Sequence, residues 1–377
     1  MSAPLDRADV VIVGGGAVGA STAFHLTELG ITDVVLVERE VLGAGSTSKA
    51  AGGIRLQFGD ELNVRIAQRS LAQLGELEAR VRELSDIEID VDLRQPGYLF
   101  LLDDADDLAV FRTALATQQA LGVPARELTV DEVGAMLPQL TTDDLIAATY
   151  CPLDGRAVPE AVVQGYAAAA TARGARVRQG CEVTGIELRG DAIAAVQTSK
   201  GRIETSTVVC AAGIWSKDVA AHVGVELPVH GEAHWLFFSR EDGGLPADLP
   251  VTIDFTSGFY VMRETHGILF GGRAATIEEL AEPAVRRLPL MTDIPVQSSW
   301  WGWYDMSPDC NAIVGEAVGI DRFLFATGFS GHGFQQAPAV GEHLAELIAG
   351  RATTLDLSAL ALERFARGES RREHFYI

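Results

Sequence analysis

The sequence predicts an α/β fold in which a parallel sheet is assembled from segments at both ends of the chain. Near the start, the apolar run at residues 10–13 leads directly into a G-x-G-x-x-G motif and then a helical pattern. Near the other end, a second apolar run at residues 323–327 leads into another glycine-rich turn and helix. Short β-branched runs of this kind are typical of buried parallel strands. Between them, residues 225–302 alternate as antiparallel strands do, which predicts a second sheet.

The motif near the start consists of Gly14, Gly16 and Gly19. Its first glycine permits a tight turn, the second lets the backbone approach a pyrophosphate, and the third lets the helix pack on the strand. The pyrophosphate then lies at the positive N-terminus of the helix. A second strand, residues 33–37, ends at Glu38, where an acid can bond a ribose hydroxyl. This arrangement predicts a dinucleotide site for NAD or FAD rather than NADP, and the motif alone leaves those two open.

The remaining elements follow from hydrophobic patterns and from helix stop signals. Helical patterns cover residues 20–29, 61–84, 108–121, 158–173 and 337–348. Further strand patterns cover residues 176–181, 182–188, 193–198, 202–205 and 208–213. We predict a dinucleotide-binding domain built from residues 1–89, 152–224 and 303–377. A substrate-binding domain with a mixed or antiparallel sheet is predicted from residues 90–151 and 225–302.

Composition excludes several classes of function. The chain has 377 residues, enough for two domains, and a formal net charge of −22. That charge disfavours binding to nucleic acid or to an anionic membrane surface. No stretch of 18 or more apolar residues is present, so we expect no membrane-spanning helix.

Cysteine spacing and the N-terminal sequence bear on the compartment. The four cysteines are far apart and form no C-x-x-C pair, which argues against a cysteine zinc site or a redox dithiol. We expect no metal site. Free thiols and a start, MSAPLDRADV, that lacks a signal-peptide pattern favour a cytoplasmic location.

Two small-residue segments predict close approach of the backbone to a ligand. The loop GAGSTSKAAGGIR, residues 43–55, is rich in Gly, Ala and Ser and places Arg55 just before the helix at residues 61–84. The strand at residues 208–213 also ends in small residues. Because glycine-rich turns stand at opposite ends of the chain, we expect one extended ligand, with its nucleotide on the first turn and a redox ring on the second.

Aromatic residues gather in the predicted substrate sheet. They either line a substrate pocket or fill the core, and the sequence leaves both readings open. The residues concerned are His234, Trp235, Tyr260, Trp300, Trp301 and Trp303.

Together, the segments GGGAVG, VLVERE, GSTSKAAGGIR, VVCAAGIWS and FATGFSGHGFQQAPAVGE resemble the D-amino-acid-oxidase-type FAD-dependent oxidoreductases. The branch that they resemble most contains sarcosine oxidase and the dimethylglycine or proline dehydrogenase β-subunits. The match extends over nearly the whole chain, and GFSGHGF favours FAD over NAD. The resemblance implies a Rossmann-like FAD-binding domain of separated segments, with a mixed-sheet substrate domain over the flavin.

The resemblance also implies roles for individual residues. Arg55 and Gln335 would hold a substrate carboxylate, Tyr260 would be an active-site tyrosine, and His332 would tune the flavin. The residues implied in FAD binding are Gly14, Gly16, Ala17, Val18, Gly19, Glu38, Arg39, Ser46, Thr47, Ser48, Ala51, Gly52, Val183, Ala212, Gly213, Trp215, Gly328, Gly331, His332, Gly333, Phe334 and Gln335.

Three positions depart from monomeric sarcosine oxidase. Gln335 stands where monomeric sarcosine oxidase has a carboxylate-binding lysine. We associate glutamine at this position with the β-subunit branch. Gly302 stands where the branch has the cysteine that bonds to flavin, which predicts that FAD is not covalently attached there. Leu269 stands where monomeric sarcosine oxidase has a lysine that promotes reaction with oxygen. This difference predicts that oxygen is a poor electron acceptor.

The leading functional hypothesis is therefore an FAD enzyme. It would oxidise the C–N bond of an amino acid or an N-alkyl amine to an imine, with hydride transfer to flavin N5. One alternative is an FAD-dependent 2-hydroxy-acid dehydrogenase. Another is an FAD-containing electron-relay or assembly subunit without a substrate of its own. The expected partner is a small-molecule amine or amino acid, and both homo- and hetero-oligomers remain open.

Overall fold

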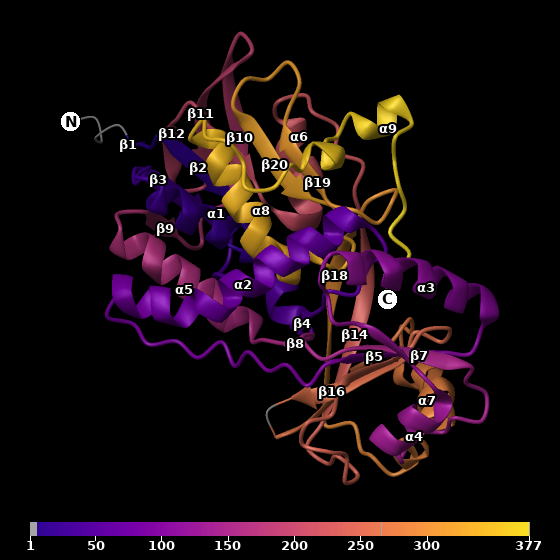
Figure 1. The fold of residues 1–377 in the computed structure, drawn as a ribbon. Helices are drawn as coiled ribbons and strands as arrows, with labels where there is room; N and C mark the ends of the chain where they lie inside the picture. The colour runs from indigo at the N-terminus through magenta and orange to yellow at the C-terminus, as the bar shows by residue number, and fades with distance from the viewer. Residues whose placement is uncertain (1–5, 265, 377) are drawn as a thin grey trace.

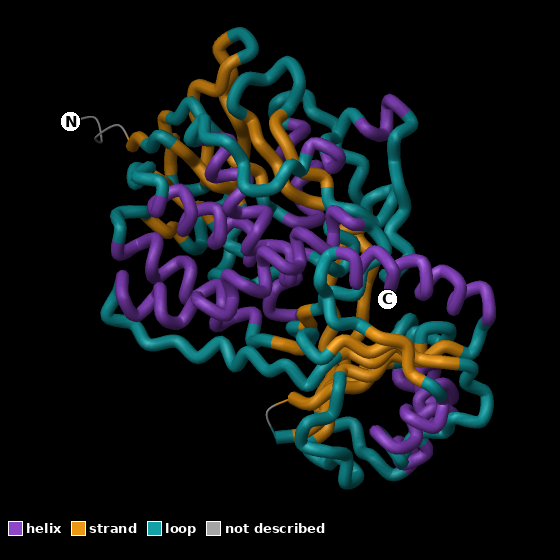
Figure 2. The backbone as a smooth tube through the Cα atoms, viewed as in Figure 1, coloured by secondary structure: helices purple, strands orange, loops and turns teal. Residues whose placement is uncertain are grey.

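The computed structural model describes residues 6–264 and 266–376. The first five residues, part of the segment inspected for a signal pattern, lie outside this description. In Figure 1 the elements form an upper part, rich in long helices, and a lower part built around a broad sheet. Figure 2 shows the helices of the upper part stacked against strands, with the strands β14 and β18 reaching down into the lower part.

A six-stranded sheet forms the centre of the upper part. Its strand order is β19-β20-β13-β2-β3-β9, and all neighbours are parallel except β19 and β20. Its strands are β2 (Val10–Val13), β3 (Val34–Val37), β9 (Arg176–Arg178), β13 (Val208–Cys210), β19 (Ile313–Glu316) and β20 (Phe323–Thr327). Because side chains alternate along a strand, Ile12 packs into one core while Val11 and Val13 pack into another, on the opposite face.

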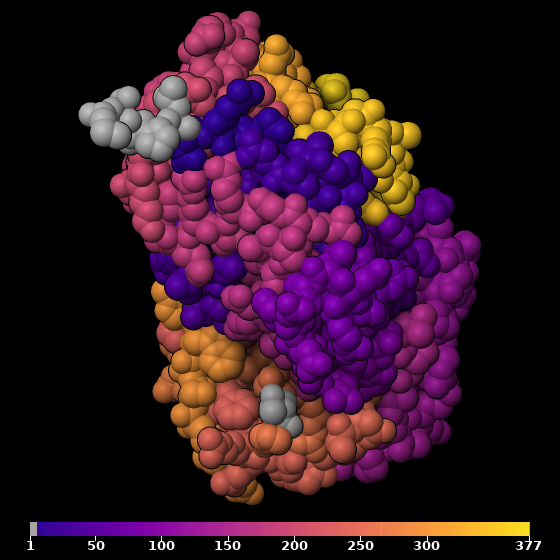
Figure 3. All heavy atoms as spheres, turned by 90° about the vertical axis from the view of Figure 1, so that its left-hand side faces the viewer, coloured from indigo at the N-terminus to yellow at the C-terminus, as the bar shows by residue number. Residues whose placement is uncertain are grey.

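Helices cover one face of this sheet and a smaller sheet covers the other. The helices are α1 (Ala17–Glu28), α2 (Glu61–Leu84), α5 (Pro159–Ala172) and α8 (Gly333–Ile348). The other face carries α6 (Ser216–Ala221) and a four-stranded sheet of order β1-β12-β11-β10, namely β1 (Asp6–Arg7), β10 (Val183–Arg189), β11 (Ala192–Thr198) and β12 (Gly201–Glu204). Segments far apart in the sequence thus form one layered unit, and Figure 3 shows atoms from early, middle and late parts of the chain side by side in its upper half.

The lower part is an eight-stranded mixed sheet of order β18-β14-β17-β16-β15-β5-β7-β6. Only β15 and β5 pair in parallel. Its strands are β5 (Tyr98–Leu102), β6 (Arg126–Leu128), β7 (Ala147–Cys151), β14 (His230–Ser239), β15 (Val251–Asp254), β16 (Tyr260–Glu264), β17 (Gly267–Gly271) and β18 (Ser298–Met306). The accompanying helices are α3 (Ala105–Ala120), α4 (Val130–Met136) and α7 (Ile277–Arg287). The expected α/β fold with a second, mixed sheet is confirmed, although β18 runs past the predicted domain bound at residue 303.

Short elements connect the two parts. The strands β4 (Gly53–Ile54) and β8 (Gly155–Arg156) pair with each other, close to Arg55. The remaining elements are η1 (Ser46–Lys49), η2 (Gly213–Trp215), η3 (Pro289–Thr292), η4 (Ser358–Leu360) and α9 (Arg364–Arg367).

Three helices begin earlier than the sequence pattern predicted. Helix α3 starts at Ala105 rather than residue 108, because the Asp104 side chain caps it by accepting hydrogen bonds from the Asp106 and Asp107 amides.

Helix α1 starts at Ala17 rather than residue 20, because the Gly19 backbone is helical and packs on the preceding turn. Helix α8 starts at Gly333 rather than residue 337 and contains Pro338. Packing against α1 supports this proline-containing turn, since the Ser21 hydroxyl donates a hydrogen bond to the Pro338 carbonyl at 3.3 Å. In contrast, α2 has the predicted bounds.

Candidate active site

The two glycine-rich turns lie at the same edge of the six-stranded sheet. Strand β13 separates β2 from β20, and all three run parallel, so their carboxyl ends face the same side. Gly14, after β2, has φ +109°, and a Cβ there would lie 2.3 Å from the Ala211 carbonyl oxygen after β13. A Cβ at Gly19 would lie 2.0 Å from the Gly14 carbonyl oxygen. Only glycine fits at these positions, so the turn leaves its backbone open toward a ligand.

Glu38 is held at the end of β3 beside this turn. Its carboxylate accepts hydrogen bonds from the Gly15 amide at 2.7 Å and from the Glu40 amide at 2.9 Å. A carboxylate has about four acceptor positions, so capacity remains for ribose hydroxyls. Glu38 therefore stabilises the glycine turn and also lines the cavity.

A cavity of about 390 Å³ extends from the first glycine turn to the mixed sheet. Most of the residues implied in FAD binding line it: Gly14, Gly16, Ala17, Val18, Glu38, Arg39, Ser46, Thr47, Ala51, Gly52, Val183, Ala212, Gly213, Trp215, Gly331, His332, Gly333, Phe334 and Gln335. Gly19, Ser48 and Gly328 are not among the lining residues. Gly19 packs α1 on the turn, whereas a Cβ at Gly328 would meet Ser307 at 3.0 Å. These assignments to FAD binding stay predictions.

The residue predicted to contact adenine lines the cavity. Val183 at the start of β10 lines it together with Trp215 and Arg39. The Arg39 guanidinium carbon lies 3.7 Å from the centre of the Trp215 ring, which is a cation–π contact.

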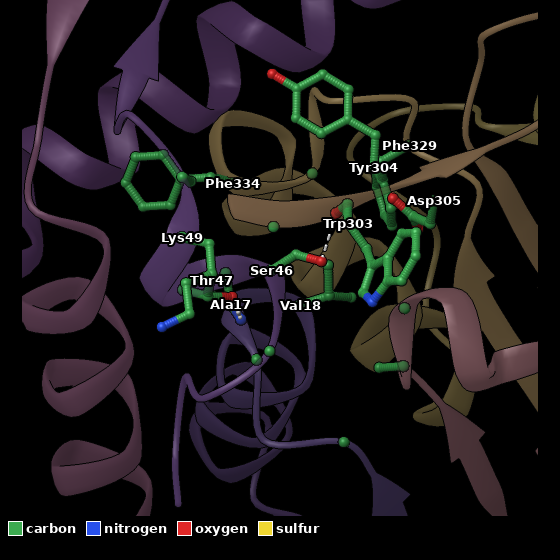
Figure 4. Close-up of a pocket in the computed structure, with 18 of the residues that line it drawn as sticks. Ala17, Val18, Ser46, Thr47, Lys49, Trp303, Tyr304, Asp305, Phe329 and Phe334 are labelled. Carbon is green, nitrogen blue, oxygen red and sulfur yellow. Dashed lines mark hydrogen bonds between the residues drawn. The ribbon is translucent and has the colours of Figure 1, made fainter. Parts of the chain in front are cut away.

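Near the middle of the cavity, η1 is tied to β18. The Ser46 hydroxyl donates to the Trp303 carbonyl at 2.6 Å, as the dashed line in Figure 4 shows. A Cβ at Gly302 would lie 2.5 Å from the Lys49 Cβ, so a larger residue at 302 would require Lys49 to move. Leu269, on β17, is buried and does not line the cavity.

Arg55 is the main charged group at the other end. It is 5% exposed, and its guanidinium carbon lies 4.2 Å from the centre of the Phe58 ring. Its Nη1 donates to the Gln57 carbonyl, and its Nη2 donates to the Phe375 carbonyl and to His332 Nε2, the latter at 3.0 Å. Within the described residues, no Asp or Glu oxygen lies within 4.0 Å of its nitrogens. Burial consequently lowers the pKa of Arg55, although Glu373 and Asp154 oppose this effect.

Two of the other predicted catalytic residues, Gln335 and His332, contact Arg55. The Gln335 amide oxygen accepts a hydrogen bond from the Arg55 backbone amide at 2.8 Å, so this end of Gln335 is already used. Burial, and secondly the Arg55 charge, lower the pKa of His332 to about 3. His332 is therefore neutral near pH 7, and its Nε2 acts as an acceptor for Arg55.

Three tyrosines line the cavity, of which the sequence analysis named only Tyr260. Tyr98 lies on β5 and Tyr304 on β18. Burial raises the pKa of Tyr304 to about 12 and also raises the pKa values of Tyr98 and Tyr260, so all three are protonated near pH 7. The sequence pattern placed Tyr98 on a strand of the predicted substrate domain but gave no sign of which face meets the cavity. Tyr304 was assigned to the dinucleotide-binding segment that begins at residue 303, whereas it lies on β18 of the mixed sheet.

The aromatic residues of the mixed sheet divide between cavity and surroundings. His234 and Trp303 line the cavity, and the His234 ring stacks on Tyr304 with ring centres 3.7 Å apart. Trp235, Trp300 and Trp301 do not line it. In the described part of the chain, no group of three or more His, Cys, Asp or Glu side chains is arranged to hold a metal ion. Nor does any described helix combine the length and apolar character required to cross a bilayer.

The fold and the site together define a dinucleotide-binding oxidoreductase with a separate substrate sheet. Comparison with known proteins agrees, because the family model for DAO, FAD dependent oxidoreductase, matches residues 9–347. The chain belongs to this family, and its cofactor is FAD. The first glycine turn, Glu38 and the second glycine-rich turn at Gly331–Gly333 all line one cavity, which fits FAD, whose nucleotide and ring they would hold at opposite ends.

Individual relatives cover nearly all of the chain. L-proline dehydrogenase from P. horikoshii is 31% identical with a TM-score of 0.90, covering 97% of this chain and all of that one. Mitochondrial sarcosine dehydrogenase of Mus musculus is 28% identical over 396 residues, covering 97% of this chain but 42% of that protein. FAD-dependent oxidoreductase domain-containing protein 1 of Xenopus laevis is 30% identical over 420 residues, covering 96% of this chain and 83% of that protein. The chain thus spans less than half the length of sarcosine dehydrogenase.

Proposed function

We propose that this protein oxidises the C–N bond of an amino acid or N-alkyl amine whose carboxylate binds Arg55. The observation that supports this proposal is a buried guanidinium that faces the cavity and has no acidic partner within salt-bridge distance among the described residues. Buried charges are normally paired, and a guanidinium matches a carboxylate through two parallel hydrogen bonds. A substrate carboxylate would therefore complete the site.

The protein's own groups orient the substrate and limit its protonation state. Bound FAD supplies the acceptor for the two electrons that leave the C–N bond. His332 is neutral but already bonded to Arg55, and the three tyrosines are protonated, so none is a ready base near pH 7. We therefore infer that the substrate amine reacts in its neutral form. Anchoring its carboxylate on Arg55 fixes the position of the α-carbon, and such positioning accelerates reactions strongly.

The relatives support a secondary-amine substrate. The names of L-proline dehydrogenase and sarcosine dehydrogenase identify substrates that combine a secondary amine with one carboxylate. The cavity offers Arg55 for the carboxylate and the rings of Tyr98, Tyr260 and Tyr304 for the rest of the molecule. The cytoplasmic location and the poor use of oxygen stay predictions.

Anaerobic titration of the flavin tests this function. A panel of N-methyl amino acids, cyclic, D- and L-amino acids and 2-hydroxy acids is added to FAD-loaded protein, and bleaching of the flavin band is recorded. We expect bleaching by a carboxylate-bearing amine, and slow reoxidation when air is readmitted. Bleaching by hydroxy acids alone would identify a 2-hydroxy-acid dehydrogenase. A loaded flavin that no compound reduces would favour the electron-relay or assembly subunit.

A further inference from the structure

The segment that follows α9 brings Phe375 beside Arg55. In Figure 1 this yellow segment descends from α9 toward the junction of the two parts. Phe375 is 1% exposed and packs against Phe111, with ring centres 4.2 Å apart, and its carbonyl accepts a hydrogen bond from Arg55. No sequence motif predicted this contact between Arg55 and Phe375, which lie 320 positions apart.

Glu373 holds this segment in place. Its side chain is buried, and its carboxylate accepts hydrogen bonds from the Gly59 amide at 3.2 Å, the Asn63 side chain at 2.9 Å and the Phe375 amide at 3.0 Å. Within the described residues, no Lys, Arg or His nitrogen lies within 4.0 Å of this carboxylate. Among charged groups, Glu373 contributes most to opposing the fall in the pKa of Arg55. Glu373 thus lies close enough to affect Arg55 without a direct contact, and the Phe375 carbonyl binds the guanidinium.

The hydrogen bonds of Arg55 leave no complete fork for a carboxylate. A guanidinium binds a carboxylate bidentately through Nε with Nη2 or through Nη1 with Nη2. Both hydrogens of Nη2 are used, one by the Phe375 carbonyl and one by His332. A bidentate carboxylate must therefore displace one of these two acceptors. His332 is the N-cap of α8, whereas the Phe375 carbonyl lies in a segment outside any helix or strand, so we infer that this carbonyl is the acceptor that moves.

We propose that the Phe375 carbonyl, positioned by Glu373, occupies the carboxylate site of Arg55 until the substrate carboxylate replaces it. This inference rests on the proposed function and adds an internal competitor for the substrate. Glu373 is a positioning residue that lowers affinity for carboxylates in two ways. It holds the competing carbonyl in place, and its negative charge offsets that of Arg55.

The test uses a ligand that resembles a cyclic amino acid but cannot be oxidised to an imine in the same way. Binding of pyrrole-2-carboxylate and of its neutral analogue pyrrole-2-carboxamide to the FAD-loaded protein is measured from flavin spectra. The variant is Glu373→Gln, and Glu369→Gln is the matched control because Glu369 is exposed on the same segment and bonds to Arg367. Unfolding temperatures and FAD content are recorded for each protein.

We expect Glu373→Gln to bind pyrrole-2-carboxylate about tenfold more tightly, a change of ~1.4 kcal/mol. Binding of the carboxamide should change less than about twofold. In an Arg55→Gln background, Glu373→Gln should no longer tighten binding of the carboxylate, because both residues act on the contact between Arg55 and that carboxylate. With an oxidisable substrate, KM should fall while kcat changes little. A purely structural role for Glu373 predicts weaker binding of both ligands instead.

Weaker, unchanged or non-selective binding by Glu373→Gln would overturn the proposal. If that variant does not fold, a crystal structure of the wild-type protein with pyrrole-2-carboxylate decides the question. We expect the Phe375 oxygen to lie beyond hydrogen-bond distance from Arg55 in that complex, and a retained bond would refute the displacement. Failure of the wild-type protein to bind the carboxylate or to be reduced by any amine would instead reject the proposed function, and the displacement with it.

Discussion

The two ends of the cavity are built in different ways. The nucleotide end consists of backbone: Gly14 and its neighbours form a turn whose shape allows no side chain, and Glu38 closes it from the next strand. The substrate end consists of side chains brought from distant segments, with Arg55 held by His332 and the Phe375 carbonyl. A local motif therefore specifies the first end, whereas only the folded chain assembles the second. Substitutions at the two ends should accordingly separate FAD binding from substrate binding.

The largest effect on cofactor binding is expected at the nucleotide end, from Gly14→Ala. The new Cβ would lie 2.3 Å from the Ala211 carbonyl oxygen in a backbone conformation with φ +109°. Relief of the clash would cost about 3 kcal/mol, roughly a 100-fold loss of FAD affinity if the turn must reform on binding. FAD content and denaturant unfolding measure the change. Gly75→Ala is the matched control, because Gly75 lies within α2 with no atom near its Cβ position, and it should leave FAD binding intact.

At the substrate end, Arg55→Gln should have a large effect on turnover and little on the cofactor. Loss of a buried, bidentate partner for a carboxylate costs about 3–4 kcal/mol, so kcat/KM should fall by about 10²–10³-fold. FAD content should stay near that of the wild type. Arg65→Gln, on an exposed face of α2, provides the comparison and should retain activity. Equal losses in the two variants would mean that Arg55 does not bind substrate.

A pH-dependent effect of intermediate size is expected from His332. Its pKa is about 3 in the folded protein, below the ordinary value of 6.5. Between these two pKa values His332 is protonated in the unfolded state but neutral in the folded state. The stability contributed by neutral His332 is therefore complete above pH 6.5 and is lost as the pH falls. The difference in unfolding free energy between the wild type and His332→Gln should change by up to about 1.4 kcal/mol per pH unit below pH 6.5. A pH-independent difference would show that His332 does not stay neutral.

The smallest expected effect is that of Arg39→Ala. This change removes the cation–π contact with Trp215 at the adenine end, worth about 0.5–1 kcal/mol at a partly exposed position. FAD affinity should fall about two- to fivefold, with no change in KM for the substrate. Titration of apoprotein with FAD measures this, and an effect confined to KM would contradict the division between the two ends.

The geometry of the first glycine turn could be predicted from the sequence because its signals are local. The spacing of Gly14, Gly16 and Gly19, and the position of Glu38, need only neighbouring residues for their interpretation. The turn at Gly331–Gly333 was also recognisable, and packing of α8 on α1 explains why it lies beside the first one.

The substrate end was predicted only in part. Arg55 was singled out, but its partners were not, because Phe375 and Glu373 lie about 320 residues away in a segment without a motif. Tyr98 was expected on a strand, but strand patterns do not reveal which face meets a cavity. Tyr304 was missed because the predicted substrate domain stopped at residue 302, before the last part of β18. Such contacts depend on how β5, β18 and the segment after α9 converge, which local patterns do not encode.

The central claim is that the buried guanidinium of Arg55 binds the carboxylate of an amine substrate. The most direct measurement is the anaerobic rate of flavin reduction by N-methylglycine or L-proline and by the matching carboxamide, in wild-type protein and Arg55→Gln. We predict that the wild type prefers the carboxylate by at least about 100-fold and that Arg55→Gln loses this preference. Equal rates for carboxylate and carboxamide in the wild type, or a preference that survives in Arg55→Gln, would contradict the account.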